Sequence, residues 1–264
     1  MGLSPTCPSC YSRGVTSRLV ATALAGLALL SAGCDNNTAT PTAPSSGALR
    51  VTAVRSVLRT GEVMPLTVTT GAGAPVAAAM WASSDGSVLG IGPTGIATAG
   101  RAGRVTVTVT AGTASGSLPL RVVPDYQGTW AGAVARPQLT CGAASAAPLC
   151  QPGAGTGGTL TLRVVQTGDQ LTAVLTDSAE PTAQVPLTGQ VTSDDQLALA
   201  GRLDTPALAP LVRVDVATFR GSLDVVLGTL TGSYQLNVDR VPASGGALQS
   251  DYRAQVQYRN LARP

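Results

Sequence analysis

The chain has 264 residues and no His, and its 17 basic residues are all Arg, set against 14 acidic residues. Without His and Lys it has no imidazole general base, no Ser-His or Cys-His couple, no His-ligated metal and no Schiff-base chemistry. Gly (31) and Pro (18) make up about a fifth of the chain and aromatic residues only 3%, which favours short strands joined by tight turns over helices.

The first 33 residues have the layout of a secretory signal. Arg13 and Arg18 precede an apolar run at 19–30, and small residues follow it. The run is too short to remain in a bilayer as a permanent helix. We therefore expect residues 1–33 to be a signal peptide. A start codon at Val15, read as Met, would shorten the signal to 19 residues and leave the Cys7 and Cys10 pair untranslated.

Leu30-Ser31-Ala32-Gly33-Cys34 resembles the lipobox of bacterial lipoproteins, with Ser31 where that family usually has Leu. In the family, the Cys thiol receives a diacylglycerol and becomes the N-terminus after cleavage. The resemblance implies that Cys34 is the lipid attachment residue, detectable by palmitate incorporation. It also implies a bacterial cell envelope protein anchored to a membrane, at its periplasmic face or at the cell surface. The alternative is an ordinary cleaved signal with an incidental Cys.

Residues 34–47 are rich in Pro, Ser and Thr and have no apolar period, so we expect a flexible tether. Arg13 and Arg18 leave with the signal, and 15 Arg then face 14 acidic residues. These Arg are scattered along the chain rather than clustered. The nearly neutral charge and the scatter of Arg predict no nucleic-acid partner.

Residues 48–123 alternate apolar and polar side chains, as Val105, Val107 and Val109 do with the Thr residues between them. Such a period of two, with β-branched residues, predicts strands with one buried face. Turn residues recur about every ten positions. The spacing predicts about seven short strands in a two-sheet sandwich.

Trp81-Ala82-Ser83-Ser84-Asp85, followed ten residues later by Gly95-Ile96-Ala97-Thr98-Ala99, resembles the bacterial immunoglobulin-like domain of group 2, found in invasin- and intimin-like surface proteins. The resemblance covers nearly all of residues 49–123. It implies an immunoglobulin-like spacer or cell adhesion element without catalytic residues. Trp81 is expected to be structural core, filling the space between the sheets.

Residues 124–264 predict a second domain of eight strands in simple succession and no helix. A meander of this kind is most simply closed into an up-and-down antiparallel β-barrel, which leaves no exposed sheet edge. The expected strands lie at about 126–136, 157–167, 170–177, 184–193, 196–204, 210–221, 224–239 and 247–260.

Gly128-Thr129-Trp130 resembles the G-x-W start of lipocalins and of avidin-like barrels. The resemblance implies that Trp130 is structural core and plugs the closed end of the barrel. An eight-stranded barrel can hold a small apolar ligand or be filled by its own side chains, and both alternatives stay open here.

Cys141 and Cys150 lie in a stretch rich in Gly, Ala and Pro at about 137–156. An exported protein meets an oxidising compartment, so we predict a disulfide between them. The alternative is a pair of free thiols that bind a metal. The closed loop could gate a barrel mouth or be a tolerated insertion.

Acid-base chemistry on carboxylates alone would need a pair in a cleft, and the sequence predicts none. The candidates lie in a turn, at strand ends or on polar faces, and are Asp194, Asp195, Asp204, Asp215, Asp224 and Asp239. We therefore expect no enzyme, no catalytic residue, no cofactor and no metal.

The leading hypothesis is an all-β, lipid-anchored envelope protein that acts as a non-enzymatic structural or interaction module with a protein or cell-surface partner. The alternative is a lipocalin-like carrier of a small apolar ligand, with the Cys141–Cys150 loop as its lid.

Overall fold

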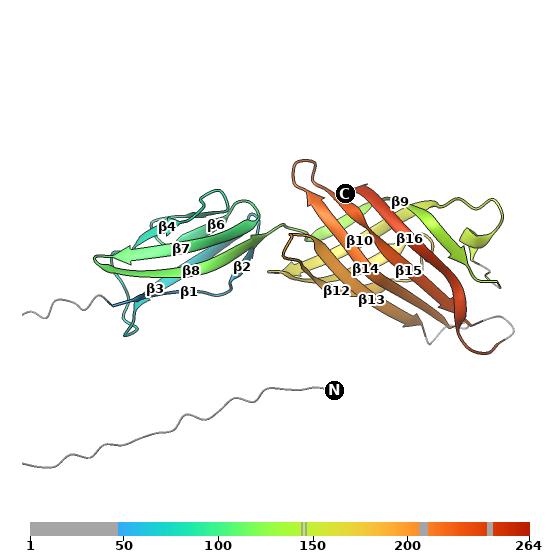
Figure 1. Ribbon diagram of the computed structural model, residues 1–264, viewed down its shortest axis with the longest axis horizontal. Helices are drawn as coiled ribbons and strands as arrows, with labels where there is room; N and C mark the ends of the chain where they lie inside the picture. The colour runs from blue at the N-terminus through green and yellow to red at the C-terminus, as the bar shows by residue number, and fades with distance from the viewer. Residues whose placement is uncertain (1–46, 144, 146, 206–210, 242–244) are drawn as a thin grey trace, which may run out of the picture. The chain divides into compact units, whose positions relative to one another are not determined.

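The computed structural model describes residues 47–143, 145, 147–205, 211–241 and 245–264, which belong to one compact unit. The described chain is all-β: a two-sheet sandwich is followed by a closed eight-stranded antiparallel barrel (Figure 1). The expected signal peptide, Cys34 and the expected tether up to residue 46 lie outside the described residues.

The sandwich consists of two four-stranded sheets, with strand orders β1-β3-β6-β5 and β2-β8-β7-β4. Neighbouring strands are antiparallel except β2 and β8, which run parallel. The strands are β1 (Leu49–Ala53), β2 (Val57–Arg59), β3 (Val63–Thr70), β4 (Met80–Ser83), β5 (Leu89–Ile91), β6 (Ile96–Ala99), β7 (Gly103–Ala111) and β8 (Ala114–Val123).

The sandwich core forms because one face of each sheet is apolar. On β7, Val105, Val107 and Val109 are buried while Thr106 and Thr108 between them are exposed, as the period of two predicts. Side chains from both sheets meet in one cluster. The two sheets therefore pack face to face, as in a β-sandwich.

Trp81 and Gly95, which begin the two halves of the sequence motif, lie against each other in the sandwich. Trp81 lies on β4, is half-buried rather than fully enclosed, and packs against both apolar clusters of the sandwich. Gly95 has φ +80°, and a Cβ there would lie 3.0 Å from the Trp81 indole. Only Gly fits this position without moving the ring. In the turn after β4, Asp85 accepts hydrogen bonds from the Ser87 amide (2.9 Å) and hydroxyl (2.6 Å).

The barrel is a simple meander in which each strand pairs with the next, and β16 pairs with β9 to close it. A single 3-10 turn, η1 (Pro148–Cys150), lies in the loop after β9. The strands are β9 (Gly128–Cys141), β10 (Gly157–Thr167), β11 (Gln170–Asp177), β12 (Val185–Val191), β13 (Leu197–Thr205), β14 (Val212–Asp224), β15 (Thr229–Arg240) and β16 (Gln249–Leu261).

Two strands end later than the sequence predicts, and β15 begins later, at Thr229 instead of near residue 224. β9 continues to Cys141 instead of ending near residue 136, because its last residues still pair with β16 up to the register Cys141↔Tyr252. β14 continues to Asp224 instead of ending at Gly221, so the hairpin tip between β14 and β15 is residues 225–228.

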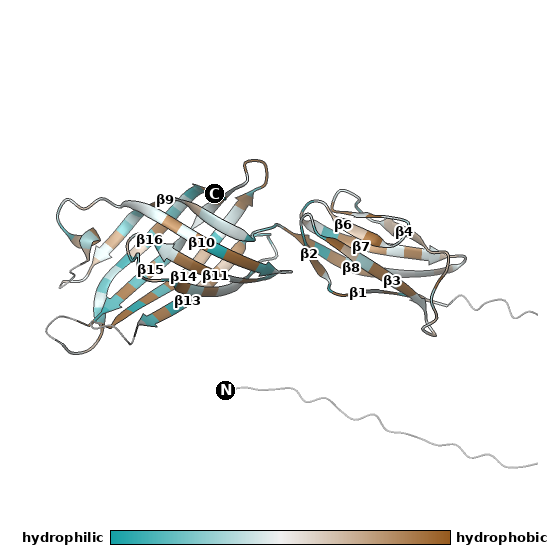
Figure 2. Ribbon diagram, turned by 180° about the vertical axis from the view of Figure 1, so that it is seen from behind, coloured by the Kyte–Doolittle hydropathy of each residue, from teal (hydrophilic) through white to brown (hydrophobic). Residues whose placement is uncertain are grey.

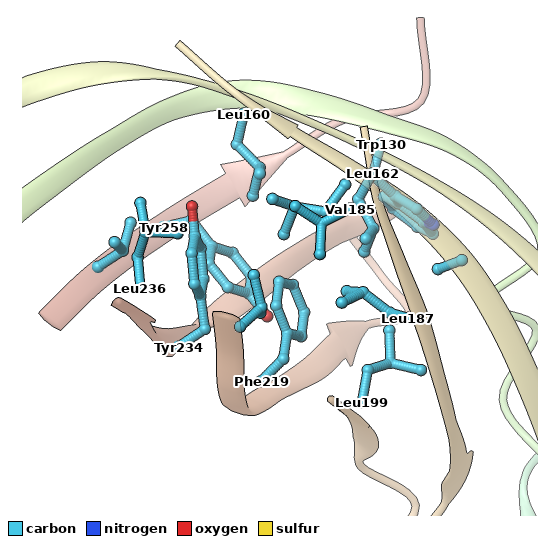
Figure 3. Close-up of a cluster of buried hydrophobic side chains, with 14 of the residues drawn as sticks. Trp130, Leu160, Leu162, Val185, Leu187, Leu199, Phe219, Tyr234, Leu236 and Tyr258 are labelled. Carbon is cyan, nitrogen blue, oxygen red and sulfur yellow. The ribbon is translucent and has the colours of Figure 1, made fainter. Parts of the chain in front are cut away.

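The alternation along the barrel strands separates lumen from surface. On β10, Leu160, Leu162 and Val164 are buried, and the residues between them are exposed. Figure 2 shows the resulting bands of hydrophobic and hydrophilic residues along the strands. Large apolar side chains fill the lumen, as Figure 3 shows for Trp130, Leu160, Leu162, Val185, Leu187, Leu199, Phe219, Tyr234, Leu236 and Tyr258.

The segment between β8 and β9 is held by hydrogen bonds instead of being a free linker. The buried side chain of Gln166 donates to the carbonyl oxygens of Pro124 (3.1 Å) and Gly168 (2.9 Å) and accepts from the Tyr126 amide (2.8 Å). Arg121, on the last sandwich strand, forms an ion pair with Asp195 in a barrel loop (2.8 Å). These contacts restrict motion between the last sandwich strand and the barrel.

We expect Trp81→Ala to lower the free energy of unfolding by about 3 kcal/mol, because the indole packs against both apolar clusters. Met80→Ala is the matched control, since the neighbouring side chain is 76% exposed and its loss should change stability by less than about 0.5 kcal/mol. Chemical denaturation followed by circular dichroism measures both. Equal small effects would contradict the packing role of Trp81.

Candidate functional site

The barrel lumen is the place where a ligand or a reaction would be expected in this fold, and its middle is occupied by aromatic side chains. Phe219 stacks on Tyr234 and on Tyr258, each at a ring-centroid distance of 5.2 Å. The Tyr258 hydroxyl donates to the carbonyl oxygen of Arg220 (2.6 Å). All three rings are almost completely buried. Side chains therefore take the space that a lumen ligand would need.

Trp130 closes the end of the barrel at which β9 begins. Its indole is fully buried and donates to the carbonyl oxygen of Tyr126 (2.8 Å), and the Arg263 guanidinium lies 4.5 Å from the ring centroid. The Tyr126 hydroxyl donates in turn to the carbonyl oxygen of Asp195 (2.6 Å). Burial raises the pKa of Tyr126 to about 12, so this donor keeps its proton at neutral pH. Trp130 lies where the G-x-W resemblance implies a plug.

The loop bearing the disulfide covers the opposite end of the barrel. Cys141, the last residue of β9, is bonded to Cys150 in η1, which confirms the predicted disulfide. Within the loop, Ala147 is buried in the barrel core, and Leu149 packs against that core. The Ser145 hydroxyl hydrogen bonds to a carboxylate oxygen of Asp251 (2.5 Å). The loop is thus packed onto the barrel and forms part of its closure.

A buried ion pair lies below this loop. Arg136 on β9 and Asp177 at the end of β11 form a salt bridge with both side chains almost fully buried. Asp177 also accepts from the Tyr234 hydroxyl and from the Ala179 amide (2.8 Å), and Arg136 donates to the carbonyl oxygen of Gly157 (2.9 Å). Among the described residues, Nε of Arg136 has no hydrogen-bond partner.

A second polar cluster lies on β15, β16 and the loop that follows β11. Arg240 at the end of β15 forms ion pairs with Glu180 and Asp251, whose side chains are 10% and 3% exposed. The Tyr252 hydroxyl donates to Glu180 (3.0 Å). Each of the three buried carboxylates, Asp177 included, therefore receives at least two donors, which offsets much of its cost of burial.

This arrangement connects strands through tyrosine hydroxyls that keep their protons. Burial, reinforced by the neighbouring carboxylates, raises the pKa of Tyr234 and of Tyr252 well above the ordinary tyrosine value. Their hydroxyls thus remain donors to Asp177 and Glu180 across the physiological range. The contacts link β9, β11, β15 and β16 at the end of the barrel away from Trp130.

Of the surface carboxylates considered in the sequence, Asp204, Asp215 and Asp239 lie around the Arg213 guanidinium on β13, β14 and β15. Asp204 pairs with Arg213 (2.7 Å), Asp239 pairs with Arg253 (2.9 Å), and Asp195 with Arg121. Asp224 instead binds backbone amides of the following turn.

Sequence reasoning missed the buried charges Arg136, Asp177, Glu180 and Asp251. For two of them a signal is present: Arg136 follows the inward-facing Val134 by two positions, and Asp177 follows Leu175 in the same way. A charged residue in phase with an apolar stripe predicts a buried polar group.

Within the described ranges, no three His, Cys, Asp or Glu side chains are grouped so that they could hold a metal ion. The same part of the chain contains no helix that is long and apolar enough to cross a membrane.

No protein-family model matches the chain. No curated protein is significantly similar to it. Solved structures with a weak likeness include surface layer protein SbsC domains 1-6, at 14% identity and TM-score 0.23 over 76% of this chain and 39% of that chain. They also include the S-layer protein rSbsC(31-844), at 15% identity and TM-score 0.24 over 76% of this chain and 32% of that chain. A further one is S-layer protein SbsC domains 5-6, at 12% identity and TM-score 0.23 over 80% of this chain and 97% of that chain. The chain thus spans about a third of the length of the first two, and the likeness is too low to assign a function.

We expect Asp177→Asn to destabilise the barrel by about 3 to 5 kcal/mol, because it leaves the buried Arg136 guanidinium without a counter-charge. Asp204→Asn is the matched control: its pair with Arg213 is exposed, and its loss should cost less than about 1 kcal/mol. Urea denaturation measures both variants. A cost for Asp177→Asn no larger than that of the control would show that the buried pair is dispensable.

Alkaline pH should destabilise the protein through its buried tyrosines. Their folded-state pKa values lie above the unfolded value of about 10, so their contribution is fully present below about pH 10 and is lost as the pH rises further. Tyrosinate absorbance from the four described tyrosines should therefore appear only together with loss of the native circular dichroism spectrum. Tyrosinate formation in a protein that still gives a native spectrum would contradict their burial.

Proposed function

We propose that the protein is a non-enzymatic, lipid-anchored module of the bacterial cell envelope, in which the sandwich acts as a spacer and the barrel is displayed for interaction. The observation that supports the proposal most is the barrel itself: its lumen is filled by side chains, and both of its ends are covered. Such a domain presents surface instead of enclosing a substrate.

A spacer needs a stiff connection to the domain that it presents. The hydrogen bonds of Gln166 to the segment between β8 and β9, and the ion pair between Arg121 and Asp195, supply one. With the tether predicted at 34–47, this gives a flexible base and an ordered upper part. Flexibility at the base lets a displayed surface reach partners in many orientations.

The packed lumen favours display over the carrier hypothesis. A hollow of about 270 Å³ exists at the Trp130 end, but its lining of Thr60, Pro124, Leu223 and Val225 places it at the mouth and not in the lumen. The buried polar groups are paired with one another, which supports a structural role over catalysis. A purified protein that retains an apolar ligand in native mass spectrometry would favour the carrier.

The anchor is tested by metabolic labelling with radioactive palmitate. We expect label in the wild-type protein and none in Cys34→Ala, because the lipobox resemblance makes Cys34 the acylated residue. Ser31→Leu is the matched control: it restores the residue usual in the family and should keep the label. Label that persists in Cys34→Ala would refute the lipid anchor.

A further inference from the structure

The hairpin between β14 and β15 ends in three consecutive aliphatic side chains that point into solvent. Val225, Val226 and Leu227, here called the aliphatic tip, are 75%, 89% and 67% exposed. Figure 2 shows this loop in the hydrophobic colour beside the C-terminus, projecting beyond the strands. A contiguous exposed apolar group of this kind marks an interaction site more often than isolated apolar residues do.

Three backbone amides of the turn have hydrogen-bond acceptors within the turn itself. Asp224 Oδ1 accepts from the amides of Val226 (2.9 Å) and Leu227 (3.0 Å), and its carbonyl oxygen accepts from Gly228 (2.8 Å). Gly228 has φ +65°, which this turn closure requires. Because these three amides are satisfied within the turn, the tip can enter an apolar medium without stranding those donors.

Two exposed basic side chains lie on β14, which leads into the tip, and on β16, which pairs with β15. Arg220 on β14 and Arg259 on β16 are exposed, and neither forms an ion pair with a carboxylate among the described residues. An apolar tip with basic residues behind it matches the layers of a bilayer surface. The tip would meet the acyl chains, and the basic residues would meet the anionic headgroups.

We propose that the aliphatic tip inserts into a phospholipid bilayer, with Arg220 and Arg259 facing anionic headgroups. A protein partner fits less well, because protein interfaces rely on Tyr, Trp and Arg anchors, and the tip has only short aliphatic side chains. The inference rests on the proposed anchor in one respect: a 14-residue tether, which spans at most about 50 Å, lets the anchored protein turn the tip toward the same membrane and raises its effective concentration there.

Val226→Trp in the full chain places a fluorescent reporter at the tip. With vesicles of phosphatidylcholine and phosphatidylglycerol, we expect its added emission, relative to wild type, to shift to shorter wavelength and to be quenched by brominated acyl chains. Val54→Trp is the matched control, since Val54 is 87% exposed on the sandwich. Its emission should stay that of a water-exposed Trp.

Two further variants test the two parts of the proposed contact. Replacing Val225, Val226 and Leu227 by Ser should lower the vesicle partition constant by roughly tenfold for each side chain, because each loses its apolar burial. Adding Arg220→Gln and Arg259→Gln to the Val226→Trp chain should raise the phosphatidylglycerol fraction needed for the same emission shift. Both sets of positions are exposed, so the fold should survive, which circular dichroism checks.

The outcomes separate the tip from the anchor. A shift in a Cys34→Ala background supports the tip without the lipid. Flotation of the protein with vesicles while the reporter at position 226 keeps an aqueous spectrum overturns the tip and leaves the anchor. Absence of flotation in every variant overturns both. A shift that follows protein concentration and ignores vesicles indicates a second copy of the chain as the occupant and overturns the bilayer assignment.

Discussion

The pairing of β16 with β9 is the constraint on which the second half of the molecule depends. Once these strands are joined, the sheet has no free edge, and every second residue of eight strands must point into one narrow lumen. The lumen then has to be filled from within, and the stacked rings of Phe219, Tyr234 and Tyr258 do so. Closure thus explains both the order of the barrel and the lack of room for a guest among these rings. The sandwich has open edges and relies instead on the packing of two sheets across Trp81.

The two ends of the barrel are covered by different chemistry. At one end an indole, held by the Tyr126 carbonyl, provides an apolar cover. At the other, Arg136 and Arg240 are paired with carboxylates beneath a loop closed by the Cys141–Cys150 bond. Buried ion pairs add little net stability, but they penalise any pairing that separates the charges. A shift of the β9 register by one residue would turn Arg136 outward and leave Asp177 buried without its partner. The polar end of the barrel therefore adds to the apolar lumen in specifying the strand register.

Much of the fold follows from local pattern, and the rest depends on contacts distant in sequence. The alternation of apolar and polar residues predicts the barrel strands, because a strand with one buried face requires it. The two Cys residues of the loop likewise predict the disulfide between them. The sequence places a strand end at Gly221, but this residue lies inside β14, where a Cβ would come within 2.5 Å of the Tyr258 hydroxyl. That need for Gly comes from a residue on another strand and leaves no local trace. The buried position of Asp177 can be read from the apolar stripe of β11, but its partner cannot, since Arg136 lies 41 residues away on β9.

The parallel pairing of β2 with β8 has a mechanical consequence. Val57, Leu58 and Arg59 lie opposite Arg121, Val122 and Val123, so the early part of the sandwich and its last strand run side by side in the same direction. If the chain is held at its N-terminal side and pulled through the barrel, force that has passed β1 enters β2 at its start and leaves β8 at its end. The hydrogen bonds between β2 and β8 are then loaded in shear and share the force. In an antiparallel pair pulled from one end, the bonds would instead break one after another. A domain connected in this way resists extension between its two chain ends.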